Sequence, residues 1–457
     1  MNTKAKRTAL PATAGAATVA LLLPLTACGG DASADGNGST VTVTVGYQSR
    51  TINTVTAGTL LRSLGYFEKQ LNSLGDGVTY KVDWQDYATG APITAQMTAR
   101  KIDIGSMGDF PLLINAARGK QLGKPTRLVS VTGYNLRGGL NTIVVAPGSP
   151  LTSLKDLKGK KVSTSVGSAA DGTLVRALRR AGLDPAEDIE KLNQQPAVGA
   201  SALDAGSADA LSQFVAWPGL LAQQGKAKAL YDGARLDLPT FHGVTAVEEF
   251  AKKRPAVLEA FLKAQTQATD YLDAHPVAAA EKVAKATGLP AETVYLYNGA
   301  QGIATFDPAI KPQLVAALKE DVSILKDAKL TGDVDVDAFV DDQYVKKALG
   351  PTAYAERLAA TPPKPAGEVW PKGAGKTLSF TSPTALLRHV AGHRDEVRAA
   401  YVPDATTGTP WFADRAVWVA DGGALLPFVA PETARAYVAG HGGARVVPYA
   451  EALELAS

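Results

Sequence analysis

The folded part of the chain is expected to begin with the stretch Val41-Thr42-Val43-Thr44-Val45-Gly46-Tyr47. Its alternating β-branched residues, ending near a glycine, predict an opening strand. Apolar residues at helical spacing predict a helix over residues 54–71, and residues 78–84 and 91–99 repeat the order of strand and helix. This alternation predicts an α/β fold, with a sheet covered by helices on both faces.

A second unit with the same order of strand, loop and helix starts after Pro147-Gly148-Ser149-Pro150. Residues 154–162 predict a short helix that turns into a strand, and residues 171–181 predict a helix ended by Gly182. The chain has 457 residues, and single cores tend to split beyond roughly 250 to 300 residues. We therefore expect two similar lobes in residues 41–350, with the second lobe at about 146–243.

The rest of the chain has a different pattern. Residues 247–349 are mostly helical, with prolines near the expected helix starts, where proline is tolerated. Residues 351–374 are rich in proline and predict a linker. Residues 375–457 follow as a separate, small α+β domain.

A single cysteine, Cys28, lies near the start of the chain and excludes disulfides within one chain. Residues 1–28 combine early positive charges with an apolar run, a pattern typical of an export signal. The motif Leu25-Thr26-Ala27-Cys28 resembles the lipobox of bacterial lipoproteins, which implies lipid attachment at Cys28. The alternative is an ordinary secretory signal with an incidental cysteine. Residues 29–40 are small and polar and predict a flexible tether, so we expect a lipid anchor on the extracytoplasmic face of the cell membrane.

Charge and hydropathy argue against nucleic acid as a partner and against a membrane span in the folded part of the chain. The net charge of +3 is small for this length and is not gathered into long basic runs, which argues against nucleic acid. No apolar run after the export signal reaches the length that a membrane span needs.

Open α/β sheets bind ligands at the carboxyl ends of their strands, so polar residues at those places are the candidates. Gly167-Ser168, ahead of an expected helix, offers backbone N–H groups and the positive end of a helix dipole to an oxyanion. The candidate ligand-binding residues are Gln48, Ser49, Arg50, Thr51, Gly108, Asp109, Tyr134, Asn135, Ser165, Gly167, Ser168 and Trp217.

Four of these candidates have a plainer interpretation. Ser168 could cap its helix, and the same hydroxyl could also contact a ligand. Arg50 could be an ordinary surface arginine, and Asp109, after a glycine, could cap a helix. Trp217 could be a core or hinge aromatic rather than a pocket wall.

The stretch 43–349 contains Gly46-Tyr47-Gln48, Gly65-Tyr66-Phe67-Glu68, Asp103-Ile104-Gly105, Gly167-Ser168 and Asp209-Ala210. In these pieces it resembles the nitrate-, sulfonate- and taurine-type substrate-binding proteins of ABC importers. The resemblance implies a two-lobed periplasmic-binding-protein-like (type II) fold, with the ligand in a cleft that closes about a hinge. It also implies a small anionic ligand, a membrane permease as partner, a monomer, no cofactor and no catalytic step.

One departure from that family affects the ligand. Its members often carry an acidic residue or an aspartate-proline pair after the last strand of the second lobe, whereas this chain has Ala216-Trp217-Pro218. The sequence therefore does not determine the charge of the cleft at this position, nor the identity of the ligand.

Residues 375–457 resemble the NosL family of copper-handling accessory lipoproteins, for example at Thr409-Pro410-Trp411-Phe412 and His441-Gly442-Gly443. Cu(I) favours thiolate and thioether ligands, and this segment has neither cysteine nor methionine. His389 and His393 are four residues apart and could share a helix face and chelate, but we favour the interpretation that they are a solvated pair. We therefore expect no metal.

Two other classes of function compete with solute binding. An enzyme on the same fold would need a placed nucleophile, such as a lysine or cysteine, in the cleft. A metal-handling accessory lipoprotein would depend on residues 375–457.

Overall fold

A computed structural model describes residues 40–361 and 367–457. The expected export signal, Cys28 and nearly all of the expected tether lie outside these residues. Within the described ranges, no helix combines the length and the apolar character that crossing a membrane requires.

The first lobe is built on a six-stranded mixed sheet in the order β11-β4-β10-β3-β1-β2. Strand β1 pairs in parallel with β2 and β3, whereas β10 runs antiparallel to both β3 and β4. The strands are β1 (Thr40–Tyr47), β2 (Thr79–Asp86), β3 (Ile104–Gly108), β4 (Thr126–Asn135), β10 (Thr240–Val247) and β11 (Thr305–Phe306).

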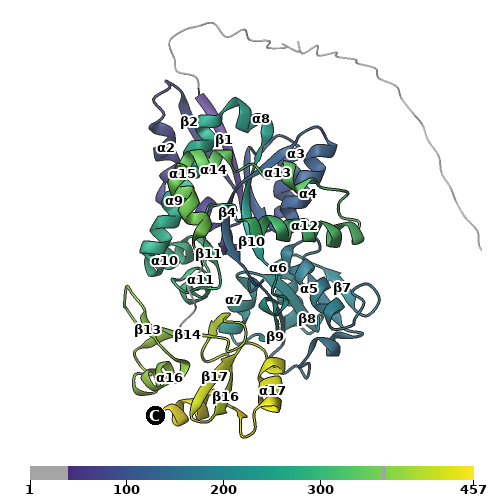
Figure 1. Ribbon diagram of the computed structural model, residues 1–457, viewed down its shortest axis with the longest axis vertical. Coiled ribbons are helices and arrows are strands. Elements are labelled where there is room, and N and C mark those ends of the chain that lie inside the picture. The colour runs from purple at the N-terminus through teal and green to yellow at the C-terminus, as the bar shows by residue number, and fades with distance from the viewer. Residues whose placement is uncertain (1–39, 362–366) are drawn as a thin grey trace, which may run out of the picture. The chain divides into compact units, whose positions relative to one another are not determined.

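Helices cover both faces of this sheet (Figure 1). Val43 and Val45 of β1 point into one buried cluster with Phe261, and Met107 and Val131 belong to a second cluster. The first cluster is covered by α1 (Thr59–Leu64), α2 (Tyr66–Asn72), α8 (Glu248–Lys253), α9 (Pro255–Ala274), α14 (Gln343–Leu349) and α15 (Pro351–Ala359). The second is covered by α3 (Gly90–Thr98), α4 (Asp109–Gln121), α12 (Pro312–Asp327) and α13 (Val336–Phe339). A third cluster, described below, includes residues of η1 (Ile52–Ala57), α10 (Pro276–Thr287) and α11 (Ala291–Asn298).

The second lobe has a five-stranded sheet in the order β7-β6-β8-β5-β9. Its predicted boundaries, 146–243, need correction at both ends. Strand β5 pairs with β8 and β9 in the second sheet, whereas β10 already belongs to the first sheet. The strands are β5 (Asn141–Val145), β6 (Lys161–Thr164), β7 (Glu190–Asn193), β8 (Ala210–Phe214) and β9 (Lys228–Asp232). The helices are η2 (Leu154–Leu157), α5 (Ala169–Arg180), α6 (Pro196–Asp204) and α7 (Trp217–Gln223), and η3 (Gly233–Leu236) lies on the segment that leads back to the first sheet.

Two crossing segments join the lobes. The chain leaves the first sheet after β4, through residues 136–140, and returns to it before β10, through residues 233–239. The second lobe is therefore an insertion within the first.

The single helix predicted over residues 54–71 is wrong in detail, because the structure has η1, α1 and α2 in its place. Gly65 ends α1 and precedes α2 with a φ of 64°, a conformation that glycine adopts at little cost. The break is a matter of backbone conformation, since a Cβ at Gly65 would meet no atom within 4 Å.

The predicted linker over 351–374 also differs from the structure. Pro351 stands at the first position of α15, and Tyr354 is buried in the core of the first lobe. Lys311, itself buried, donates to the carbonyl oxygens of Leu358 and Ala360 at 3.3 and 3.2 Å and so holds the end of this helix.

Residues 367–457, called the C-terminal domain below, form two antiparallel sheets with three helices. The domain starts before the predicted residue 375, because β12 pairs with β13 and β14. The strands are β12 (Gly367–Pro371), β13 (Leu378–Phe380), β14 (Val397–Pro403), β15 (Pro410–Phe412), β16 (Val417–Asp421), β17 (Ala424–Phe428) and β18 (Arg445–Val447). The helices are α16 (Pro383–Gly392), α17 (Pro431–Gly440) and α18 (Tyr449–Ala456).

Candidate ligand-binding site

A cavity of about 420 Å³ lies between the two lobes. This volume is within the range of small-molecule pockets. The first lobe contributes Gln48, Thr89, Gly90, Ala91, Thr94, Ala95, Gly108, Pro111, Ile114, Arg118 and His242. The second lobe contributes Ser165, Val166, Gly167, Ser168, Ala169, Asn193, Gln194, Gln195 and Phe214.

Five of the predicted residues line this cavity: Gln48, Gly108, Ser165, Gly167 and Ser168. The Gln48 amide is held at both ends, because its Nε2 donates to the Ser106 carbonyl at 3.0 Å and its Oε1 accepts from the Thr51 hydroxyl at 3.2 Å. Gly108 lies beside His242, since a Cβ there would stand 3.4 Å from the imidazole Nε2, an ordinary van der Waals distance. The ends of β1 and β3 therefore contribute to the cavity as predicted.

The start of α5 combines both interpretations of Ser168, which caps the helix and also lines the cavity. Its Oγ accepts from the Asp171 N–H at 3.3 Å. The predicted oxyanion cradle needs correction, because the Gly167 N–H donates to the Asp171 carboxylate at 3.0 Å and the Ser168 N–H donates to the Ser165 carbonyl at 3.0 Å. The N–H of Ala169, in the first turn, has no acceptor within the helix, and Ala169 lines the cavity.

Ser49, Arg50 and Thr51 follow β1 but do not line the cavity. The Ser49 Oγ donates to the Asp86 carboxylate at 2.6 Å, and its N–H donates to the same group at 2.8 Å. Arg50 is exposed, which agrees with its surface interpretation. Thr51 is buried behind Gln48. The rule of strand ends therefore located the loop, but only one of its four polar side chains points into the cavity.

Asp109 also lies outside the cavity lining. It is 1% exposed, and its carboxylate accepts from the backbone N–H groups of Phe110 at 2.8 Å and Phe241 at 3.2 Å. Burial raises the pKa of Asp109 to about 6. Asp109 therefore supports the start of α4 and its packing on β10.

Three more predicted residues do not line the cavity: Tyr134, Asn135 and Trp217. Tyr134 is buried, with the Lys311 ammonium 6.0 Å from its ring centroid. The Asn135 amide donates to the Ile303 carbonyl at 2.7 Å and accepts from the N–H groups that follow β4. Trp217 packs against two hydrophobic clusters, in agreement with its core interpretation.

The cavity also holds residues that the sequence analysis missed. Asn193, Gln194 and Gln195 follow β7, so the same rule of strand ends would have found them had that strand been recognised. Arg118 lies in the third turn of α4, and His242 lies on the antiparallel strand β10. No strand-end pattern marks either of these two positions.

The electrostatics of the cavity favour a negative ligand. Arg118 is the one charged side chain among the described lining residues, and that lining contains no aspartate or glutamate. The starts of α3 and α5 both line the cavity, and helix N-termini carry partial positive charge.

His242 adds a neutral polar group. It is 3% exposed, and burial lowers its pKa to about 3, so the imidazole is neutral at pH 7. The Asn53 Nδ2 lies 3.4 Å from the Nδ1 of His242, a contact in which Nδ1 accepts. A neutral ring whose Nδ1 accepts carries its proton on Nε2, the ring atom nearest to Gly108.

The two lobes also touch directly. Arg176 of α5 pairs with Asp321 of α12 at 2.6 Å, with side chains 15% and 2% exposed. Phe110 of α4 packs so closely on Gly172 of α5 that a Cβ on that glycine would overlap the phenyl ring. Burial and the nearby Asp109 charge hold the pKa of Asp321 well above its ordinary value. The lobes are therefore closed upon one another beside the cavity.

The histidines of the C-terminal domain do not form a recognisable metal site. The rings of His389 and His393 stack with centroids 4.3 Å apart, and the His393 Nδ1 is 2.9 Å from the His389 carbonyl oxygen. His441 stacks on Tyr437. Over residues 40–361 and 367–457, no group of three or more His, Cys, Asp or Glu side chains is placed to hold a metal ion.

Two α/β lobes, two crossing segments and a cavity between the lobes define a two-lobed, periplasmic-binding-protein-like protein. Residues 81–279 match the family described as NMT1/THI5 like.

Individual relatives agree with this assignment. A putative aliphatic sulfonates-binding protein of Escherichia coli is 28% identical over 281 residues, which span 62% of this chain and 82% of that protein. The alkanesulfonate-binding protein SsuA from Xanthomonas axonopodis, solved with MOPS bound, superposes with a TM-score of 0.57 and 23% identity, over 67% of this chain and all of that one. The desulfurization enzyme DSZB has the same fold, with a TM-score of 0.50 and 17% identity over 68% of this chain and 99% of its own. The fold thus serves binding proteins and at least one enzyme.

Proposed function

We propose that this protein is the extracytoplasmic solute-binding component of an ABC importer, and that it captures a small organic sulfonate and delivers it to a membrane permease. The observation that carries the proposal is the charge of the cavity. It has one arginine, the starts of two helices and no carboxylate among its described lining residues. A carboxylate-free cavity with several donors favours a ligand that is permanently anionic at neutral pH.

The shape of the lining favours an organic sulfonate over nitrate. Pro111, Ile114 and Phe214 add apolar surface beside the polar groups. A cavity of about 420 Å³ is far larger than a four-atom anion needs, and apolar surface gains from covering a hydrocarbon group. The name of the Escherichia coli relative points to the same class of ligand.

We further propose that lipid on Cys28 holds the protein at the outer face of the membrane. This anchor would keep the binding domain near its permease by a flexible tether. In cells, Cys28→Ser should move the protein from the membrane fraction to the soluble fraction.

Isothermal titration calorimetry tests the ligand class. The chain from residue 29 onward should bind an alkanesulfonate or taurine with micromolar or better affinity, and nitrate at least tenfold more weakly. The ligand should be recovered unchanged, whereas release of sulfite would support an enzyme. If nitrate binds as tightly as every sulfonate, the proposed ligand class is wrong.

Arg118→Gln tests the role of the cavity's charge. Hydrogen bonds to charged groups contribute about 1.5–3 kcal/mol, so sulfonate affinity should fall roughly tenfold or more. Lys120→Gln is the matched control, because Lys120 is exposed on the same helix and does not line the cavity. Equal affinities for the two variants would remove Arg118 from the site.

A further inference from the structure

The C-terminal domain contacts both lobes and both of the segments that cross between them. No part of the solute-binding proposal assigns it a role. Its contacts with these parts combine polar groups, some buried and some exposed, with apolar packing.

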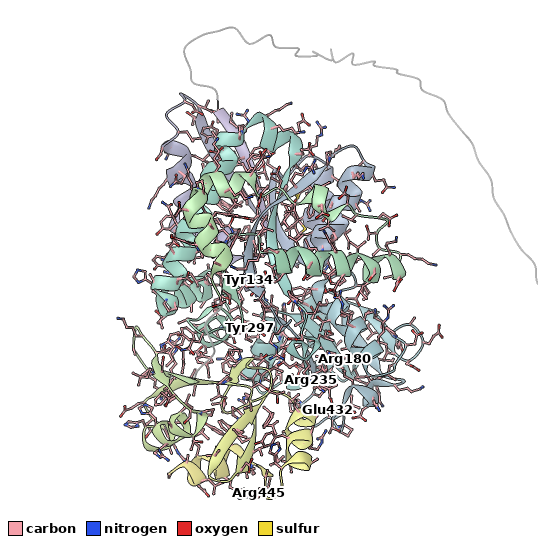
Figure 2. All side chains as sticks on the ribbon, in the orientation of Figure 1. Tyr134, Arg180, Arg235, Tyr297, Glu432 and Arg445 are labelled. Atoms are coloured by element: carbon pink, nitrogen blue, oxygen red, sulfur yellow. The ribbon has the colours of Figure 1, made fainter. Side chains whose placement is uncertain are left out.

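Contact with the second lobe centres on Asp232, at the end of β9. Asp232 is 1% exposed, and its carboxylate accepts from the Thr407 hydroxyl at 2.7 Å. The Asp404 carboxylate accepts from the Thr407 N–H at 2.8 Å and the Val429 N–H at 2.7 Å, which fixes the loop that carries Thr407. Nearby, Arg235 of η3 pairs with Glu432 of α17 at 2.9 Å (Figure 2).

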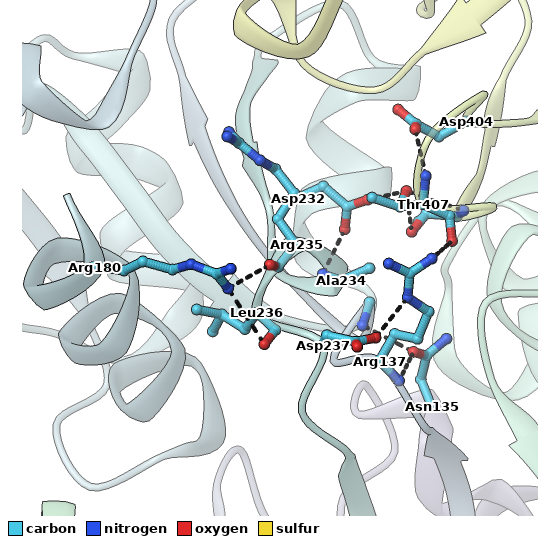
Figure 3. A network of polar contacts seen from close by, with 12 residues as sticks. Asn135, Arg137, Arg180, Asp232, Ala234, Arg235, Leu236, Asp237, Asp404 and Thr407 are labelled. Carbon is cyan, nitrogen blue, oxygen red and sulfur yellow. Dashed lines mark hydrogen bonds and ion pairs between the residues drawn. The ribbon is translucent and has the colours of Figure 1, made fainter.

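Contact with the crossing segments is made through Arg137. Its Nε pairs with Asp237 of the other crossing segment at 2.9 Å, and its Nη1 donates to the Thr407 carbonyl at 3.0 Å (Figure 3). One guanidinium therefore ties both crossing segments to the same loop that binds the second lobe. Any hinge motion that changes the backbone at residues 136–140 or 233–239 acts on these bonds.

The C-terminal domain also contacts helices α10 and α11 through specific polar pairs. Arg398 of β14 binds Glu292 of α11 at 2.5 Å and Glu281 of α10 at 3.1 Å. The Tyr295 hydroxyl of α11 donates to the Glu368 carboxylate of β12 at 3.2 Å. Helix α10 packs on α1 and α9 of the first lobe, and α11 packs on α10, on η1 of the first lobe and on α7 of the second.

One hydrophobic cluster runs through all three parts. It joins Ile52 and Leu60 of the first lobe and Val215 of the second to Trp370 and Trp411 of the C-terminal domain, all of them buried. The domain therefore packs against both lobes through one continuous core.

We propose that the C-terminal domain is a brace on the hinge, which favours the closed arrangement of the lobes before any ligand binds. Its bonds to Asp232, Arg137 and Glu292 are made while Arg176 and Asp321 join the lobes across the cleft. Opening would rotate the second lobe relative to α10 and α11, and the brace holds both. A protein held closed spends less of its binding free energy on closure, since apparent affinity scales with the population of the competent state.

Distance measurement without ligand tests the brace. The chain from residue 29 onward lacks Cys28, so Lys101→Cys in the first lobe and Glu187→Cys in the second would be its only cysteines. Both positions are exposed and can carry spin labels for double electron–electron resonance. The unchanged brace should give one dominant interlobe distance in the absence of ligand.

Two variants release opposite ends of the brace. Thr407→Val removes the bond to the second lobe, and Arg398→Gln removes those to α10 and α11. Each should add a population at longer distance and shift the ratio of open to closed forms roughly fivefold, the factor that corresponds to one net hydrogen bond. Arg445→Gln is the control, because Arg445 pairs with Glu451 inside the domain at 2.5 Å.

If both variants, shown by circular dichroism to be folded, keep the parent's distance distribution, the brace is refuted. It is refuted too if Arg445→Gln produces the same shift. Because no ligand is added, these outcomes are independent of whether the cavity binds sulfonates.

Discussion

The cavity between the lobes and the junction of the C-terminal domain with those lobes use polar groups in opposite ways. At the junction, Asp232, Glu292 and Arg398 each have a partner within the chain. In the cavity, Arg118 is exposed and His242 lines the wall with a neutral ring. The junction satisfies its polar groups internally and thereby fixes structure, whereas the cavity leaves donors available, which is what a ligand-binding site requires.

The largest expected effect is at the junction. Trp370 is fully buried, its indole N–H donates to the Ala374 carbonyl at 3.0 Å, and the Arg398 guanidinium lies 4.0 Å from its ring centroid. Trp370→Ala should lower the free energy of unfolding by about 4 kcal/mol through the cavity it leaves.

Urea denaturation monitored by circular dichroism measures this loss. The cavity variant Arg118→Gln is the comparison, and it should change the free energy of unfolding by less than about 0.5 kcal/mol, as expected of an exposed substitution. Similar losses in the two variants would break the contrast between the two regions.

A smaller effect depends on pH and concerns the neutral donor in the cavity. Burial lowers the pKa of His242 to about 3, whereas the unfolded chain has an ordinary histidine near 6.5. Below about pH 6.5 the unfolded state binds a proton that the folded state refuses, so folding stability should fall as the pH falls. His242→Gln should remove about 2 kcal/mol of the stability lost between pH 7.5 and 5.0.

Urea denaturation of parent and variant at both pH values tests this sign. Asp109 titrates in both proteins, so the difference between them isolates His242. A parallel decline in the two proteins would mean that His242 is protonated in the folded state and that its assigned role as a neutral donor is wrong.

The smallest expected effect is at Ser168, which combines a structural role with a place in the cavity. Ser168 caps α5 and also lines the cavity. Ser168→Ala should cost about 1 kcal/mol of stability as a lost cap. Ser168→Gly should lower the stability by only about 0.3 kcal/mol. Both variants remove the same hydroxyl from the site. Calorimetry would show equal losses of sulfonate affinity if the hydroxyl contacts the ligand, and unchanged affinity if Ser168 only caps the helix.

The sequence predicted the architecture well, because hydrophobic periodicity is a local signal. Residues 41–47 and 91–99 fall on β1 and α3 within a residue. The prediction of a single helix over residues 54–71 was wrong, because Gly65, in a left-handed conformation, divides an apolar pattern that is continuous in the sequence. The prediction of a linker over residues 351–374 was wrong at its start, because Pro351 begins a helix that packs on the first lobe.

The site was predicted less completely, for physical reasons that apply to particular residues. Strand ends place Gln48 and Gly108 at the cavity, but side-chain direction decides that Ser49 turns to Asp86 and that Tyr134 turns into the core. Arg118 reaches the cavity from the third turn of a helix, by packing of α4 that no local pattern encodes. The binding roles of all these residues remain predictions that the variants above can test.

The insertion of the second lobe within the first has a consequence for the order of folding. The second sheet uses residues 141–232 alone, whereas β10, at the centre of the first sheet, is made only from residues 240–247. A chain emerging from its N-terminus therefore has all strands of the second sheet before the first sheet can close. Until then, β3 and β4 lack the strand that joins them, and their unpaired edges are the part of the emerging chain most exposed to wrong pairing.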